Sequence, residues 1–322
     1  MIKAEGKHVI IREMITTALE HSDQNAISHD VRTLYSAFQE MNYGFEFFSA
    51  YTGIKKVSIF GSARTASSDP IYRHAYEFSQ KMVQAGFMVI TGAGDGIMRA
   101  AQEGAGAEKS FGLNIMLPFE QAANEFIKDD PKLITFKYFF VRKLFFVKEA
   151  NALAFFPGGF GTHDEGFETL TLLQTGKCDP APVVFIDAPG GSHWKDWHAY
   201  IQDQLLAKEL ICPEDMSLFK LTDSIDEAVN EITHFYRNYH STELIEGQTA
   251  ISLNRLITTQ AVESLNDLFS DILVKGKIIQ TPIPKGTQIG GGAPQILFYF
   301  NRRNFGRLRQ MINAINDFLP SE

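Results

Sequence analysis

The chain has 322 residues, 44% of them hydrophobic, which is ample material for a buried core. Its formal net charge of −8 at pH 7 provides no basic surface for nucleic acid or for an anionic membrane. There is no run of about 18 uncharged apolar residues and no signal-peptide apolar region, so we expect a cytoplasmic protein without a membrane span. The two cysteines, Cys178 and Cys212, lack the spacing of a metal site, so we expect reduced thiols and no bound metal.

The first part of the chain, residues 1–52, has an amphipathic helical pattern. Phe38, Met41, Phe45 and Phe48 recur at helical spacing. We expect this segment to pack as a helix on the core or on a second subunit.

Short apolar runs alternate with helical patterns between residues 53 and 240. We expect strands at 56–60, 87–90, 111–117, 133–136, 152–156, 183–186 and 218–221, and helices at 70–85, 97–104, 138–150, 194–206 and 225–239. Such alternation is typical of a parallel sheet with helices on both faces. The sequence therefore predicts an α/β protein, in which residues 53–240 form a Rossmann-like, doubly wound domain.

The pattern changes after residue 240. We expect strands at 271–280 and 294–300 and a helix at 305–318, which together indicate a small α+β extension over 241–322. The glycines at 290–292 do not stand at a strand-to-helix turn, so we interpret them as a plain loop rather than a phosphate site.

Glycine-bearing turns follow three of the expected strands. They contain Gly61 and Ser62, then Gly92, Gly94 and Gly96, and finally Gly158, Gly159 and Gly161. Ligands of open α/β sheets bind at the carboxyl ends of the strands, where these turns meet. One such loop is a weak signal, but three at the same edge favour a phosphorylated ligand held by backbone N–H groups.

The third turn lies in the sequence Pro-Gly-Gly-Phe-Gly-Thr-His-Asp-Glu at residues 157–165. An apolar run enters it and a helical pattern leaves it. Thr162, followed three residues later by Glu165, has the pattern of a capping box, which would explain both residues by helix stability alone. The N–H groups at the start of the helix also make an anion site. Residue types and spacing leave both explanations open.

The same nine residues match the motif Pro-Gly-Gly-x-Gly-Thr-x-x-Glu of the Lonely Guy (LOG) family. Its members are phosphoribohydrolases that act on cytokinin riboside 5'-monophosphates, and many carry the older label "possible lysine decarboxylase". Further features resemble the family over residues 55–240: the turn at Gly61-Ser62, the loop and helix start at 91–98, and the pair Arg142-Lys143, 15 residues before Pro157. The extra termini resemble a bacterial long form.

The resemblance implies a role for individual residues. Arg142 and Glu165 match the catalytic arginine and glutamate of the family, with Lys143 and Glu168 as supporting residues. Gly158, Gly159, Gly161 and Thr162 match its phosphate-binding turn. One departure is Phe139-Phe140, where short members often have Met-His, and this affects the expected base specificity more than the reaction.

The implied activity is hydrolysis of the N-glycosidic bond of a purine or N6-modified adenine nucleoside 5'-monophosphate, which yields free base and ribose 5-phosphate. Breaking the bond between C1' and nitrogen builds positive charge on the ribose, which the carboxylate of Glu165 would stabilise while it activates water. Arg142 stays charged at any working pH. By resemblance we expect no cofactor, and a homodimer or larger assembly with Arg142 and Glu165 near the interface.

Other classes remain as alternatives. The same glycine loops would serve a nucleotide-binding sensor or carrier without turnover. A dehydrogenase is disfavoured because Gly92, Gly94 and Gly96 have the spacing G-x-G-x-G, and because no acidic residue follows the next strand to hold a ribose. A pyridoxal phosphate decarboxylase is disfavoured because nothing in the sequence assigns a lysine to the Schiff base.

Overall fold

The computed structural model describes the chain except for residues 1–6, 24–27, 118–121, 283–292 and 320–322. The glycine loop expected at 290–292 therefore lies outside the described residues. Within the described parts, no helix combines the length and the apolar character needed to cross a membrane.

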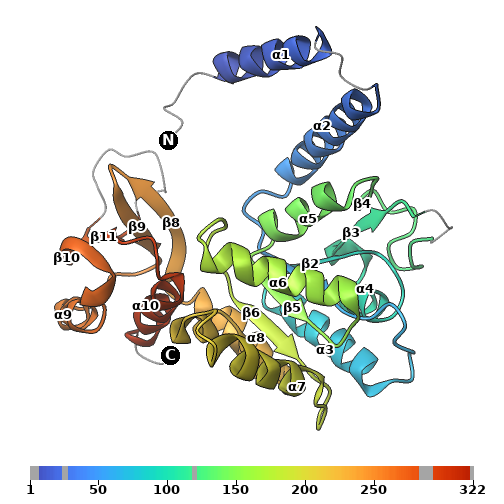
Figure 1. Cartoon of the computed structure of the whole chain (residues 1–322). Coiled ribbons are helices and arrows are strands. Elements are labelled where there is room, and N and C mark those ends of the chain that lie inside the picture. Colours follow the sequence, from blue (N-terminus) through green and yellow to red (C-terminus); the bar gives the residue numbers. More distant parts are fainter. Residues whose placement is uncertain (1–6, 24–27, 118–121, 283–292, 320–322) are drawn as a thin grey trace.

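Seven parallel strands form the central sheet, in the order β4-β3-β2-β1-β5-β6-β7 (Figure 1). The strands are β1 (Lys56–Phe60), β2 (Met88–Thr91), β3 (Ser110–Ile115), β4 (Leu133–Phe136), β5 (Ala152–Phe155), β6 (Val183–Ile186) and β7 (Lys220–Thr222). Strand β1 pairs in parallel with both β2 and β5, so the direction of strand addition reverses there. Such a switch point is where doubly wound sheets bind ligands.

Helices cover both faces of this sheet. Helices α3 (Pro70–Gln84), α4 (Ile97–Ala105) and α8 (Ile225–Phe235) share one apolar core with it, and α2 (Ser28–Ser49), α5 (Phe139–Lys148), α6 (Phe160–Gln174) and α7 (His193–Tyr200) share the other. Strand β1 shows the alternation, because Val57 and Ile59 enter the first core while Phe60 enters the second. The predicted α/β, Rossmann-like fold is confirmed.

An aromatic layer supports the helices that carry the central motif. The rings of Phe60 and Phe155, on neighbouring strands, stack with their centroids 4.9 Å apart. Phe155 stacks in turn on Phe185, at 5.0 Å. These large buried side chains fix the height of α5 and α6 above the sheet, since cores pack densely.

The N-terminal segment forms two helices, α1 (Lys7–Asp23) and α2, which lead away from the sheet in Figure 1. The predicted apolar stripe of α2 is only half buried. Phe48 is 2% exposed and Met41 packs on the core, whereas Phe38 and Phe45 are 48% and 44% exposed. The expectation that this stripe packs on the core is thus correct for the part of α2 that lies against α5.

A second sheet of four antiparallel strands, in the order β10-β11-β9-β8, forms the C-terminal part. Its elements are β8 (Tyr239–Ile245), β9 (Gln248–Leu253), α9 (Thr259–Leu268), β10 (Leu273–Thr281), β11 (Gln295–Phe300) and α10 (Phe305–Asp317). The expected strands and helix at β10, β11 and α10 are confirmed. The sequence interpretation did not find β8, β9 or α9.

Several predicted boundaries are wrong. The helix expected to reach residue 239 ends at Phe235, because Tyr239 begins β8 and is buried under the second sheet. The helix expected at 194–206 changes after α7 into a π-helix, Ile201–Leu206. The remaining short elements are 3-10 helices: Ala107–Lys109, Pro213–Leu218 and Ser270–Ile272.

Candidate functional site

A pocket of about 840 Å³ opens at the carboxyl edge of the central sheet, where the loops after β1, β2 and β5 meet. From the predicted glycine turns, it is lined by Gly61 and Ser62, by Gly92, and by Gly158, Gly159, Gly161 and Thr162. Arg142 and Glu165 line it as well. The predicted residues Gly94, Gly96, Lys143 and Glu168 do not line it, although Gly96 packs against Ser62 and Lys143 forms an ion pair with Asp164.

Two of the glycines allow the loops to pack against one another. A Cβ atom at Gly158 would lie 2.1 Å from Oγ1 of Thr162. A Cβ atom at Gly96 would lie 2.2 Å from the carbonyl oxygen of Ser62, and Gly96 also has a φ of 62°, which L residues rarely adopt. A larger residue at either position would push the loops apart.

The glycines at the start of α6 have a different environment. A Cβ atom at Gly159 or at Gly161 would meet no described atom within 4 Å, so both face open space in the pocket. Within the described chain, the N–H groups of Phe160 and Gly161 have no acceptor. Free N–H groups at the positive end of a helix dipole attract an anion.

The predicted capping box of Thr162 and Glu165 is wrong. Helix α6 begins at Phe160, with Gly159 as its N-cap and no capping side chain. The carbonyl oxygen of Gly159 already accepts the N–H groups of Thr162 and His163, each at 3.1 Å. The helix therefore starts before Thr162, and helix capping does not explain Glu165.

A buried asparagine that the sequence interpretation missed holds the loop after β2. Nδ2 of Asn124 donates to the carbonyl oxygens of Gly94, at 2.8 Å, and Ala93, at 3.1 Å. Oγ1 of Thr91 accepts the N–H of Ala93 at 3.0 Å. These bonds satisfy the polar groups of a tight loop in which Ala93 adopts a φ of 61°. No local sequence signal connects Asn124 to a loop 30 residues earlier.

Glu165 lies on α6 with its side chain directed into the pocket region, and the residue is only 5% exposed. Its Oε1 is 3.9 Å from Nζ of Lys143. Its buried Oε2 has no hydrogen-bond partner in the described chain. Burial raises the pKa of Glu165 to about 7, although the positive charges of Lys143 and Arg142 oppose this shift.

Lys143 on α5 organises the carboxylates around Glu165. Its Nζ lies 2.7 Å from Oδ2 of Asp164 and 2.7 Å from Oε2 of Glu168. Burial lowers the pKa of Lys143, but the hydrogen bonds to Asp164 and Glu168 and the charge of Glu165 outweigh burial, so the pKa is raised. Lys143 is thus placed to fix α5 against α6 beside the pocket.

Arg142 faces the pocket from the neighbouring position on α5. Its guanidinium lies 5.0 Å from the ring centroid of Phe139 and 5.5 Å from that of Phe146. Its Nε is buried and has no hydrogen-bond partner in the described chain. Since no ion pair within 4.0 Å joins it to Glu165 in the described residues, a buried donor and a buried acceptor both remain unpaired at one pocket.

The pocket also has apolar and amide residues that the sequence interpretation did not assign to it. These are Met98 at the start of α4, Asn114 on β3 and Phe160, which is 98% exposed. Asn114 was open to prediction, because it stands near the carboxyl end of a strand at the same edge as the glycine turns.

The raised pKa of Glu165 makes a prediction for stability. Because its pKa of about 7 in the folded chain exceeds the ordinary value of 4.5, protonated Glu165 favours the fold, and this contribution is lost as the pH rises through about 7. We therefore compare the free energy of unfolding of Glu165→Gln with that of the native chain. We expect this difference to shift in favour of Glu165→Gln by roughly 2–3 kcal/mol between pH 4.5 and pH 8.

Urea denaturation of both chains between pH 4.5 and pH 8 measures this difference. Glu77→Gln, which removes a carboxylate from an exposed pair with Arg73, is the matched control. If the difference in free energy of unfolding between Glu165→Gln and the native chain does not grow with pH, burial does not raise the pKa of Glu165.

Solved structures that resemble the chain include TM1055 (20% identity, TM-score 0.38, 55% of this chain and 96% of that one). They also include the molybdenum cofactor carrier protein of Chlamydomonas reinhardtii (17% identity, TM-score 0.37, 54% of this chain and 93% of that one). A third is the molybdenum cofactor binding protein of Rippkaea orientalis (18% identity, TM-score 0.36, 54% of this chain and 91% of that one). A search of curated proteins finds no match.

The family comparison bears on the motif directly. Residues 95–232 match the family model described as "possible lysine decarboxylase". This segment contains the last two residues of the loop before α4, the pair Arg142-Lys143 and the whole motif at 157–165. The label is the older one of the family that the motif resembles. Residues 95–232 are therefore similar to the LOG, or possible lysine decarboxylase, family.

Proposed function

We propose that the chain is a hydrolase that cleaves the N-glycosidic bond of a nucleoside 5'-monophosphate and releases free base and ribose 5-phosphate. The observation that carries this proposal is the buried, unpaired carboxyl group of Glu165 beside an open helix N-terminus. Gly161 and Glu165 are separated by roughly 6 Å of helix rise. This spacing is on the scale of the ribose that separates a 5'-phosphate from C1'.

The free N–H groups of Phe160 and Gly161 would hold the phosphate, together with the open space over Gly159. The ribose would then lie along the first turns of α6, with C1' near Glu165. The apolar side of the pocket, including Met98 and Phe139, would face the base. Its size and apolar character suit a purine or an N6-modified adenine.

In the reaction, the bond between C1' and the base nitrogen breaks and its electron pair leaves with the base. The positive charge that develops on the ribose is stabilised by the ionised Glu165. Water forms the new bond to C1' and gives its proton to the carboxylate of Glu165, which passes a proton on to the leaving base. The pKa of about 7 suits this exchange, because the group can both accept and return a proton near neutral pH.

Arg142 would complete the pocket by contacting the substrate or the Glu165 carboxylate. Its unpaired Nε is a buried donor that needs an acceptor, and burial lowers the pKa of Arg142, while the nearby Glu165 opposes the shift. An anionic ligand would supply the missing acceptor.

A sensor or carrier would use the same glycine loops without turnover. Burying a charge without a hydrogen-bond partner is costly. A carrier would gain nothing from such a carboxyl group beside the ribose position, whereas a hydrolase would use it in the reaction. This cost favours the hydrolase over the carrier.

Glu165→Gln separates the two functions. The amide keeps the size of the side chain but cannot accept a proton or stabilise a cation, so we expect turnover of AMP to fall about a hundredfold or more while AMP binding remains. Base release is measured by chromatography and binding by calorimetry, with Glu77→Gln as the control. Full turnover by Glu165→Gln would remove Glu165 from the mechanism.

We further propose that a second copy of the chain covers the mouth of the pocket. Phe139 and Phe140 are 51% and 57% exposed, and Phe160 projects from the phosphate turn. Exposed aromatic residues gathered at one place are typical of an interaction surface. Light scattering should give at least twice the mass of one chain, and Phe140→Asp should lower it; a monomeric native protein would contradict this proposal.

A further inference from the structure

A second pocket, of about 790 Å³, lies at the opposite edge of the central sheet. It forms where the end of α2, the amino ends of β1 and β5, and the beginning of the C-terminal part meet. Lys56 begins β1, Asn151 immediately precedes β5, and Tyr239 begins β8, and all three line the pocket. None of the residues that line it lines the pocket at the glycine turns.

Positive charge dominates this second pocket, although the chain as a whole has a net charge of −8. Lys55, Lys56 and Lys148 line it, and Glu149 is the sole carboxylate among the described lining residues. His240 adds a further group that can become positive. An acidic protein that gathers lysines in a hollow attracts anions there.

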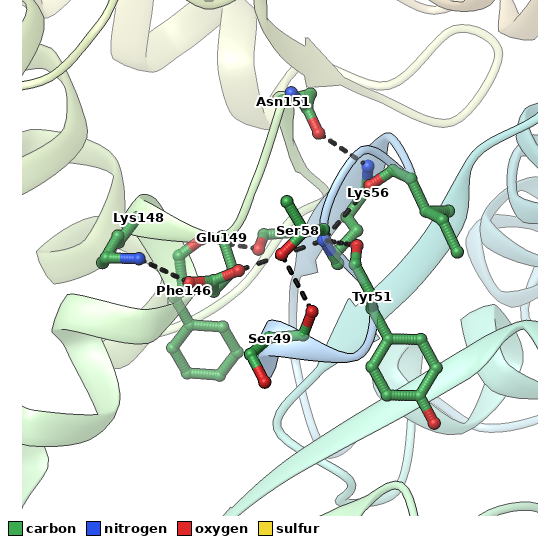
Figure 2. A network of polar contacts seen from close by, with 10 residues as sticks. Ser49, Tyr51, Lys56, Ser58, Phe146, Lys148, Glu149 and Asn151 are labelled. Carbon is green, nitrogen blue, oxygen red and sulfur yellow. Dashed lines mark hydrogen bonds and ion pairs between the residues drawn. The ribbon is translucent and has the colours of Figure 1, made fainter. Parts of the chain in front are cut away.

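The one carboxylate is already engaged by two of these lysines (Figure 2). Oε1 of Glu149 is 2.7 Å from Nζ of Lys148, and its Oε2 is 3.9 Å from Nζ of Lys56. Nζ of Lys56 also donates to the carbonyl oxygens of Tyr51 and Ile54, at 3.0 and 3.1 Å. The Lys56–Glu149 pair is therefore the fixed floor of the pocket, held by backbone groups.

Two of the three lysines, Lys55 and the Glu149-paired Lys148, also lie near aromatic rings. Nζ of Lys55 lies 4.3 Å from the ring centroid of Tyr236, and Nζ of Lys148 lies 5.3 Å from that of Phe45. Lys55 has no carboxylate within ion-pair distance in the described chain. Burial lowers the pKa values of both Lys55 and Lys56, and for Lys56 the charge of Glu149 opposes this shift.

We propose that this second pocket binds a small phosphorylated anion. Lys55 and Lys148 contact the phosphate oxygens, and the Lys56–Glu149 pair fixes the floor. Asn151 supplies a neutral donor through its Nδ2, since its Oδ1 already accepts the N–H of Lys56. The space exceeds what one phosphate needs, and the number of lysines favours more than one negative charge. A ligand here would contact α2, the central sheet and the C-terminal part together.

The test is a calorimetric titration with inorganic pyrophosphate at low salt. The full chain carries Gly161→Asp in every variant, because a carboxylate in that open position repels anions from the glycine turns without meeting another atom. We expect this chain to bind pyrophosphate, and the added changes Lys55→Gln and Lys148→Gln to weaken binding about tenfold or more. Inorganic phosphate, with less charge, should bind more weakly.

Lys109→Gln with Lys208→Gln is the matched control, since it removes the same charge from exposed lysines that do not line the pocket. Lys55→Arg with Lys148→Arg keeps both charges and should retain binding, which separates a lost site from a damaged fold. The proposal is overturned if the Gly161→Asp chain binds no pyrophosphate, or if the Gln pair and the control pair bind it equally. Because the two pockets lie at opposite edges, the outcome is independent of the reaction proposed for Glu165.

Discussion

The backbone of Ser62 joins the three loops on which the candidate site depends. Its N–H donates to the carbonyl oxygen of Pro157 at 3.0 Å, and its carbonyl oxygen accepts the N–H of Ile97 at 3.0 Å. These bonds connect the loop after β1 to the loops after β5 and β2. They are possible because Gly158 and Gly96 lack side chains where the loops touch. The start of α6 is thereby fixed, and with it the position of Glu165.

Electrostatics then give this rigid frame its chemical character. Burial holds the pKa of Glu165 near neutrality, and Lys143 binds the neighbouring carboxylates of Asp164 and Glu168 more closely than it binds Glu165. Arg142 and Glu165 each keep an unpaired buried atom. Because the unpaired donor and acceptor are already in place, few groups must move when a polar ligand binds. The second pocket uses the same principle with lysines at the other edge of the sheet.

The sequence was informative where structure depends on local signals. Most strands of the central sheet are short apolar runs that end at a turn, so the run, the turn and the following helix could be located from residue types. Strand β7 (Lys220–Thr222) is not such a run, and the prediction placed it at 218–221. Strand β8 could not, because most of its residues are exposed or half-buried and its apolar end, Leu244 and Ile245, faces solvent. Its pairing with β9 is a tertiary property that no local pattern records.

For the candidate site as well, some features could be predicted from the sequence and others could not. The glycine turns were identifiable from their place after strands, and the pair Arg142-Lys143 from its resemblance to the family. The sheet edge brings Arg142 and most of the glycines together. The capping box was a wrong inference because Gly159 can cap α6 through its backbone alone. Asn124 was missed because its partners in the loop after β2 lie 30 residues earlier in the chain. The pKa of Glu165 depends on burial, which residue spacing does not specify.

The central claim is that this pocket cleaves a nucleoside 5'-monophosphate at C1'. The most direct measurement is chromatography of the purified chain after incubation with AMP, GMP, IMP, CMP and UMP, with adenosine as the dephosphorylated control. The account predicts free base from at least one purine monophosphate and none from adenosine, because the start of α6 must hold the 5'-phosphate. Tight binding of these nucleotides without release of base, or equal release from adenosine, would contradict it.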